Sequence, residues 1–373
     1  MSLTGCDLAT ESEAAGEIVI GADLELSGSS AAIGLAYHDA LRLKVDQLNA
    51  IGVAGGKKIV LDVKDNRSDS NLSVKNIGEF GDNPEVAAVI TGSCSSCVVA
   101  AYRTINLKRL PTIALAPSTQ VSDPVAERHY VFKVAPNAAD GAAALTAEVQ
   151  RDTAIDKIGL LQIDDLYGAD GARVLRAELA KTDIGLVTGD PVKPTDTDVS
   201  GAMEKLLDTE PDALVIWTYA EQAGLAAQNA RAAGFKGRIF FDSAAAGDLF
   251  LSRPVATAAE GTTMVFTQTM VIDDVIATTP TKAARKQWFR DYTARYGSYF
   301  GYASFAADAL QLIGDALDRA GGVDRERIRD VLETSQIDGL SGPIRITPDN
   351  HSGLMPQALT MLVARGGRWR LAS

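Results

Sequence analysis

The chain has 373 residues, of which 46% are hydrophobic, and its mean hydropathy is +0.03. This size leaves room for two globular domains, and no apolar run in the sequence reaches the roughly 18 residues needed to span a bilayer. The net charge of −12 and the pI near 4.8 argue against a nucleic-acid partner, because phosphate binding needs a basic face.

The N-terminal segment contains a lipoprotein-type motif. Leu3-Thr-Gly-Cys6 places an aliphatic residue and two small residues before a cysteine, and a polar stretch suited to a flexible tether follows over residues 7–16. We therefore expect Cys6 to be lipidated. The protein would then be exported, either to the periplasm or to the outer face of the cell membrane, and would meet the membrane only through this anchor. The alternative is a chance tetrapeptide.

From residue 17 onward, strand-like and helix-like segments alternate, which predicts parallel sheets with helices on both faces. In the first half, apolar strands are expected at residues 18–24, 58–64, 86–90 and 112–116, with helices at 31–50, 71–80 and 97–107. In the second, strands are expected at 130–135, 155–163, 184–189, 213–217, 238–242 and 262–266, with helices at 138–151, 168–181, 199–207 and 221–234. These two consecutive α/β units predict two similar lobes.

The last hundred residues predict lobes that are discontinuous in sequence. Helices are expected at 281–296, 302–317 and 323–333, and strands at 343–346 and 358–363. Because these late strands must rejoin an earlier sheet, we expect several crossings between the lobes. The predicted division is a tether over 1–16, an N-terminal lobe of 17–135 plus 268–342, and a C-terminal lobe of 136–267 plus 343–373.

The junction after the strand at 86–90 is the most informative stretch. Ser93, Ser95 and Ser96 lie where the next helix starts, and the free N–H groups of a helix start attract an anion, often a carboxylate. The junction lacks the flanking glycines of a nucleophile elbow and has no arranged His or Asp partner. The sequence therefore predicts that this site holds a small carboxylate without transforming it, with no catalytic residue and no cofactor.

Cys94 and Cys97 form a C-x-x-C pair at the same junction. A zinc site would need two further ligands, and the three histidines lie far apart in sequence, so no metal site is predicted. The spacing allows thioredoxin-like redox chemistry, but the flanking residues lack that signature. A local structural disulfide, as expected in an exported protein, and two free thiols remain the alternatives.

Taken in order, several short motifs resemble those of the type I periplasmic binding proteins, in the branched-chain amino acid and amide branch that serves ABC transporters. They lie at residues 22–28 followed by Gly34, 63–69, 91–96, 116–119, 164–168, 230–235 and 261–265. The resemblance covers residues 17–365. It implies two doubly wound lobes, joined by a three-stranded hinge, that close on a small ligand.

The resemblance also implies roles for individual residues. Ser95 and Ser96, beside Ser93, match the loop whose hydroxyl and N–H groups hold the ligand carboxylate. Ser118 and Thr119 match a second loop, which supplies further donors and a carbonyl group for an ammonium. Charge-assisted hydrogen bonds of this kind contribute roughly 1.5–3 kcal/mol each.

The residues expected on the second-lobe side of the site determine which class of ligand it can bind. Tyr167 and Tyr219 match aromatic positions that close over the ligand, with interlobe packing as the alternative role. The acidic residue that pairs with an ammonium in amino acid binders corresponds to Asp242, Ser243 or Ala244, depending on the register. If Asp242 faces the cleft, an α-amino acid is expected. If Ser243 or Ala244 faces it, an aromatic or keto acid without an amine fits better, because a buried unpaired ammonium is costly.

Together, these features predict a monomeric, exported receptor that binds a small carboxylate-bearing solute, such as an amino acid or a related amide, and delivers it to an ABC permease. Two other functions remain open on the same fold. The first is a ligand-binding sensor that signals to a membrane kinase or a cytoplasmic partner. The second is an enzyme, which would need a nucleophile or base in the cleft.

Overall fold

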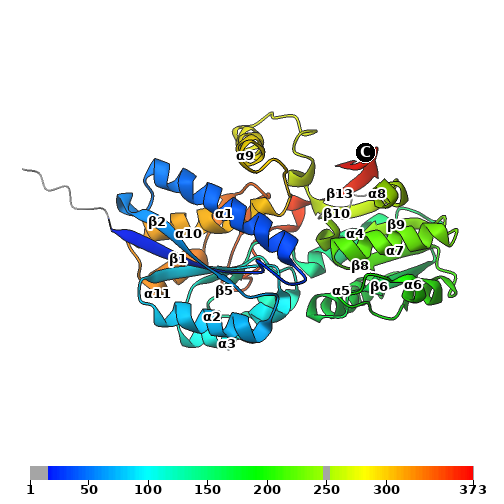
Figure 1. The fold of residues 1–373 in the computed structure, drawn as a ribbon, viewed down its shortest axis with the longest axis horizontal. Coiled ribbons are helices and arrows are strands. Elements are labelled where there is room, and N and C mark those ends of the chain that lie inside the picture. Colours follow the sequence, from blue (N-terminus) through cyan, green and yellow to red (C-terminus); the bar gives the residue numbers. More distant parts are fainter. Residues whose placement is uncertain (1–15, 247–252, 373) are drawn as a thin grey trace, which may run out of the picture.

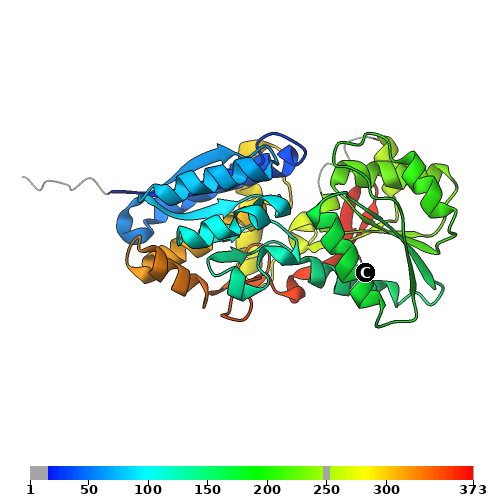
Figure 2. The same ribbon diagram turned by 90° about the horizontal axis from the view of Figure 1, so that it is seen from below.

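The computed structural model describes residues 16–246 and 253–372, which form two lobes side by side along the long axis of the molecule (Figures 1 and 2). The predicted lipidation site, Cys6, lies outside the described residues. Within the described ranges, no helix combines the length and the apolar character needed to cross a membrane.

The first lobe is built on a five-stranded parallel sheet with the order β2-β1-β3-β4-β5. Its strands are β1 (Glu17–Leu24), β2 (Lys58–Asp65), β3 (Val86–Thr91), β4 (Thr112–Ala114) and β5 (Val131–Lys133). Every residue of β3 is buried, as predicted for a central strand covered on both faces. In the register of the sheet, Asp23 of β1 lies opposite Thr91 of β3, so the loops that follow these two strands start side by side.

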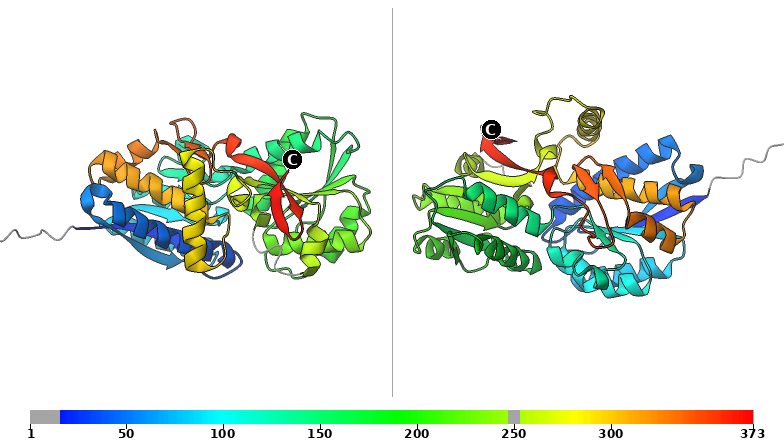
Figure 3. Two further views of the ribbon diagram at one scale, coloured as in Figure 1. Left: turned by 90° about the horizontal axis from the view of Figure 1, so that it is seen from above. Right: turned by 180° about the vertical axis from the view of Figure 1, so that it is seen from behind.

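Helices cover both faces of this sheet (Figure 1). They are α1 (Ala31–Ile51), α2 (Ser70–Asp82), α3 (Ser95–Leu107), α10 (Ala303–Ala320) and α11 (Arg325–Leu332). A further helix, α9 (Pro280–Tyr296), lies outside this layer. Helix α1 packs against α10, and α2 packs against α3. Helix α9 lies against α1 (Figure 3). Arg295 of α9 forms an ion pair with Asp46 of α1.

The second lobe contains a seven-stranded sheet with the order β14-β13-β10-β9-β8-β6-β7. Its strands are β6 (Lys157–Gln162), β7 (Gly185–Thr188), β8 (Ala213–Trp217), β9 (Arg238–Phe241), β10 (Thr263–Thr267), β13 (Leu359–Arg365) and β14 (Arg368–Leu371). Strands β6 to β10 are parallel, whereas the C-terminal hairpin β13–β14 adds two antiparallel strands at the edge. The helices of this lobe are α4 (Ala138–Val149), α5 (Leu166–Leu179), α6 (Ser200–Leu207), α7 (Ala220–Ala232) and α8 (Arg253–Ala259).

The last crossing between the lobes lies later in the chain than the predicted boundary at residue 343. Strand β12 (Pro343–Arg345) pairs with β11 (Gln336–Asp338), and Ser352 forms a bridge with Lys133 of β5. The physical reason is burial, because Ile344 and Leu354 pack into the core on the first-lobe side. The chain passes into the second lobe only at the short turn Pro356–Ala358, just before β13.

Candidate functional site

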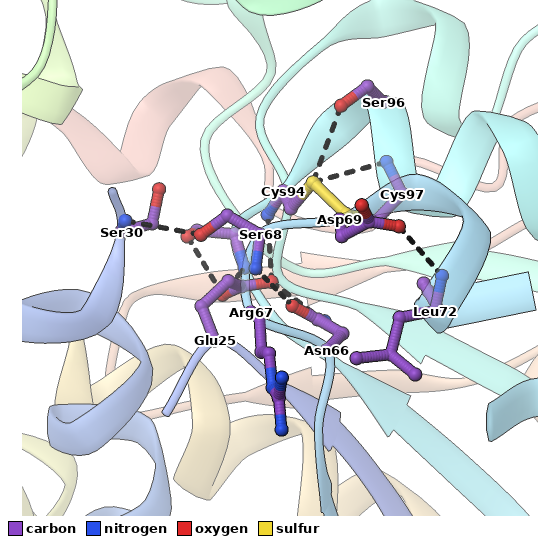
Figure 4. Close-up of a disulfide and its surroundings, with 12 residues drawn as sticks. Glu25, Ser30, Asn66, Arg67, Ser68, Asp69, Leu72, Cys94, Ser96 and Cys97 are labelled. Atoms are coloured by element: carbon purple, nitrogen blue, oxygen red, sulfur yellow. Dashed lines mark hydrogen bonds between the residues drawn. A yellow bond between two sulfur atoms is a disulfide. The ribbon is translucent and has the colours of Figure 1, made fainter. Parts of the chain in front are cut away.

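The junction between β3 and α3 is the centre of the predicted site. Helix α3 begins at Ser95, two residues before the predicted start at residue 97, because Cys94 is its N-cap and accepts hydrogen bonds from the N–H of Cys97. Cys94 and Cys97 are joined by a disulfide at this helix start (Figure 4). The hydroxyl of Ser96 lies 3.4 Å from the Sγ atom of Cys94, on the far side of the disulfide from Glu25.

Glu25, from the loop after β1, places its carboxylate at this junction (Figure 4). Its Oε2 atom accepts hydrogen bonds from the N–H of Ser93 at 2.8 Å and from the Ser93 hydroxyl at 3.0 Å, and its Oε1 atom accepts one from the N–H of Cys94 at 3.2 Å. Gly92 leaves the space for this carboxylate, since a Cβ atom there would lie 2.2 Å from Oε2. The N–H groups of this junction are thus bound by a carboxylate of the protein itself.

Glu25 is also part of a buried polar cluster. Asn66 donates from its Nδ2 atom to Glu25 at 3.2 Å and to Asp23 at 3.1 Å, and both carboxyl groups are fully buried. Burial raises the pKa of Glu25 and of Asp23, while the hydrogen bonds from Ser93 and Asn66 oppose this shift for Glu25. The cluster therefore supports the cleft wall from within the first lobe.

The second predicted loop, at Ser118 and Thr119, holds another protein carboxylate. Asp170 of α5, in the opposite lobe, accepts hydrogen bonds from the Ser118 hydroxyl at 2.8 Å, the Thr119 N–H at 2.7 Å and the Thr119 hydroxyl at 2.7 Å. Arg173, one turn along α5, pairs with Asp170 at 2.6 Å. Ser95 also supports this loop, because its hydroxyl accepts a hydrogen bond from the Ser118 N–H at 3.3 Å. The structure thus brings Ser95, Ser118 and Thr119 together around Asp170.

Lys133, at the end of β5, binds the backbone of the loop that contains Ser118 and Thr119. Its Nζ atom donates to the carbonyl oxygens of Pro117 at 3.2 Å and Ser118 at 2.9 Å, and to Oδ1 of Asn137 at 2.8 Å. Asn137 immediately precedes α4, so this ammonium links the loop to the first crossing between the lobes. Burial lowers the pKa of Lys133 to about 7, although Asp170 and other nearby carboxylates oppose this shift.

Tyr167 and Tyr219 stack in the second lobe with their ring centroids 6.2 Å apart. The Tyr219 hydroxyl donates to Asp165 at 2.5 Å, and the Tyr167 hydroxyl donates to Asp242. Asp242 is almost completely buried, which raises its pKa well above the ordinary value for an aspartate. Asp242 therefore positions the ring of Tyr167.

A cavity lies between the lobes beside these residues. The first lobe lines it with Ile33, Tyr37, Ser93, Leu115, Tyr302 and Phe305, and the second lobe with Tyr219, Ser243, Ala244 and Phe266. Of the three positions that the sequence left open for the residue facing the ligand, Ser243 and Ala244 line this cavity, whereas Asp242 bonds Tyr167. The cavity encloses about 20 Å³, which is close to the space that one water molecule needs.

Sequence reasoning missed the acidic partners of the predicted donors. Glu25, Asp165 and Asp170 lie within the motifs at 22–28 and 164–168 or just beyond them, yet no role was predicted for them. Asp165 carried a detectable signal, since it precedes Gly168 by three residues and accepts a hydrogen bond from its N–H as the N-cap of α5. Glu25 and Asp170 carried no such local signal. The backbone N–H groups that they bind belong to Ser93, 68 residues from Glu25, and to Thr119, 51 residues from Asp170.

A comparison with protein families shows where the fold belongs. A family model described as periplasmic binding protein matches residues 17–368. The chain belongs to this family. Among its relatives, the Leu/Ile/Val-binding protein homolog 7 of Brucella melitensis is 23% identical over 343 residues, which cover 89% of this chain and 84% of that protein. The Leu/Ile/Val-binding protein homolog 8 of Brucella abortus is 27% identical over 235 residues, covering 59% and 56%.

Solved structures confirm the type I periplasmic binding fold. An extracellular ligand-binding receptor from Rhodopseudomonas palustris HaA2 superposes with a TM-score of 0.87 at 24% identity, covering 96% of this chain and 100% of that chain. The branched-chain amino acid transporter substrate-binding protein LivJ from Streptococcus pneumoniae, in complex with isoleucine, has a TM-score of 0.83 at 23% identity, with coverages of 96% and 99%.

These relatives are substrate-binding proteins, and this periplasmic binding protein is likewise a binding protein and not an enzyme. The described part of the chain contains no group of three or more His, Cys, Asp or Glu side chains that could hold a metal ion.

Proposed function

We propose that this periplasmic binding protein captures a small solute between its two lobes and delivers it to an ABC permease. The observation that carries the proposal is the cavity at the lobe interface, to which Tyr219, Ser243 and Phe266 contribute from one lobe and Leu115 and Phe305 from the other. Such a position, with mostly apolar walls and a few polar groups, is typical of small-molecule sites.

Binding would require the lobes to separate and close again. A cavity of about 20 Å³ is far smaller than an amino acid or an amide, so a solute of that size enters only when the lobes part. In the present arrangement, Tyr302 of the first lobe donates to the carbonyl oxygens of Ser243 at 3.1 Å and Ala244 at 2.9 Å in the second. A ligand favours the closed form only if it binds that form more tightly, and the permease would recognise the closed form.

The candidate solutes are amino acids with apolar side chains, related amides and aromatic or keto acids. The relatives named for Leu, Ile and Val and the isoleucine complex of LivJ support the amino acids among these candidates. We further propose that the protein acts as a monomer and that a lipid on Cys6 anchors it at the outer face of the membrane.

Thermal unfolding across this panel tests the proposal. A ligand present at about 100 times its Kd stabilises the protein by about 2.7 kcal/mol and raises its Tm. Ala244→Phe, which fills the cavity, should abolish the shift, whereas Ala232→Phe, on an exposed helix position of the same lobe, should retain it. Circular dichroism checks that both variants fold. If no panel member shifts the Tm, and native mass spectrometry of the purified protein detects no bound small molecule, the proposed function is wrong.

A further inference from the structure

Asp170 makes an unusual contact across the cleft. It lies on α5 of the second lobe with 1% of its surface exposed, and three donors of the first lobe converge on its carboxylate at 2.7–2.8 Å. Two of these donors are side-chain hydroxyls, of Ser118 and Thr119, and the third is the N–H of Thr119. A carboxylate bound by several donors on one loop is the arrangement expected for a carboxylate ligand, here supplied by the protein.

The bound form of Asp170 is the anion. Burial alone would raise its pKa, but hydrogen bonds from Thr119, Arg173 and Ser118 lower it below the ordinary value. Arg173 adds a 2.6 Å ion pair and also donates to the Thr119 hydroxyl at 2.9 Å. The closed lobes therefore hold a fixed negative charge against the second of the two loops that the family resemblance assigns to ligand binding.

A second protein carboxylate, that of Glu25, binds the hydrogen-bond donors at the start of α3. Glu25 accepts from the N–H groups of Ser93 and Cys94 at the start of α3, so both loops that the resemblance assigns to the ligand already hold a protein carboxylate. A carboxylate ligand could reach these donors in an open form. Closure would then bring the carboxylate of Asp170 against the carboxylate of the ligand, and the donors are too few to bind both. Closure on such a ligand is therefore unfavourable.

We propose that Asp170 is a specificity-determining residue that takes the place of a ligand carboxylate, so that the lobes close on a small, largely apolar solute that carries no carboxylate. The inference rests on the proposed function and narrows its ligand class. The cavity between the lobes adjoins this contact through Pro117, the residue before Ser118. It fits such a solute, because Tyr37, Leu115 and Phe305 line it with apolar surface and Ser243 adds a hydroxyl group. An amide with a branched aliphatic body is the simplest member of this class.

Isothermal titration of matched pairs tests the inference. The pairs are isovaleramide with isovalerate and leucinamide with leucine, which differ only in whether a carboxylate is present. For the wild-type protein, each amide should bind at least about tenfold more tightly than its acid, the ratio that corresponds to about 1.4 kcal/mol. The Asp170→Ala variant should reverse this preference, because it frees the Ser118 and Thr119 donors and removes the opposing charge.

Two further variants control the experiment. Asp183→Ala removes an exposed acidic residue from the same lobe and should leave the preference for amides unchanged. If Asp170→Ala does not fold, Asp170→Asn replaces it, since the amide oxygen still accepts from Thr119 while the negative charge is lost. A gain in affinity for the acid in either variant supports the inference.

The outcomes separate the inference from the function on which it rests. Binding of leucine or isovalerate to the wild-type protein as tightly as of the matching amide would overturn the role of Asp170 and leave the receptor function standing. Unchanged acid affinity in Asp170→Ala and Asp170→Asn would also overturn that role. Failure of all four compounds to bind any variant, together with a failed thermal panel, would count against both proposals.

Discussion

The carboxylate of Glu25 accepts a hydrogen bond from the N–H of Ser93 at 2.8 Å, which places a negative charge of the protein at the start of α3. The register of the sheet explains this contact. Asp23 of β1 lies opposite Thr91 of β3, so the loops that follow the two strands start side by side and bring Glu25 next to Ser93. The helix start thus receives its anion from the neighbouring strand, which is favourable for the unpaired N–H groups there.

Glu25→Gln should lower the free energy of unfolding by roughly 1–3 kcal/mol. The amide has only one oxygen for the four donor groups, two on Ser93 and one each on Cys94 and Asn66, that now share both carboxylate oxygens. Urea unfolding measures the change, with Glu17→Gln, at an exposed position of the strand that precedes Glu25, as the matched control. Equal stability of the two variants would show that the Glu25 contacts contribute little.

Gly92→Ala should destabilise the protein by roughly 1–3 kcal/mol, as for other substitutions that overfill a packed site. Its Cβ atom would lie 2.2 Å from Oε2 of Glu25, and that side chain is held on all sides by its donors. Gly78→Ala is the control, because a Cβ atom there would meet no described atom within 4 Å in the interior of α2. The control should gain about 0.5–1 kcal/mol from its higher helix propensity, measured by thermal unfolding.

Lys133 should make stability rise with pH above neutrality. Its pKa is about 7 in the folded protein and has an ordinary value of 10.5, so between these values the unfolded chain binds one more proton. The contribution of this group to the free energy of unfolding then grows by about 1.4 kcal/mol for each pH unit over this window. Lys133→Met should lack this rise in urea unfolding measured from pH 7 to 9. Parallel pH profiles for the two proteins would contradict the prediction.

Tyr302→Phe should weaken binding of whichever solute the thermal panel identifies by roughly two- to tenfold, the cost of one hydrogen bond. The variant loses the donor to Ser243 and Ala244, which joins the lobes in the closed arrangement. Tyr296→Phe is the control, because its hydroxyl has no hydrogen-bond partner among the described residues. Isothermal titration measures both variants. An equal loss of affinity in the two would mean that Tyr302 does not help to close the lobes.

Much of the fold could be predicted from residue patterns, because those patterns reflect local physics. The apolar run of β3 indicated a strand covered on both faces, and all six of its residues are buried. The late crossing was misplaced because β12 is only three residues long, and its pairing with β11 depends on where Ile344 packs. A short strand carries too little periodicity to reveal its sheet.

The candidate site likewise has one part that the sequence indicated and one part that depends on the tertiary structure. A strand end followed by small polar residues and a helix start indicated the donors at Ser93, and the family resemblance implied those of Ser118 and Thr119. Only the tertiary structure decided which acceptors they meet, namely Glu25 and Asp170. The reason is that donors arise from local backbone geometry, whereas their partners depend on strand order and on how two lobes, distant in sequence, come together.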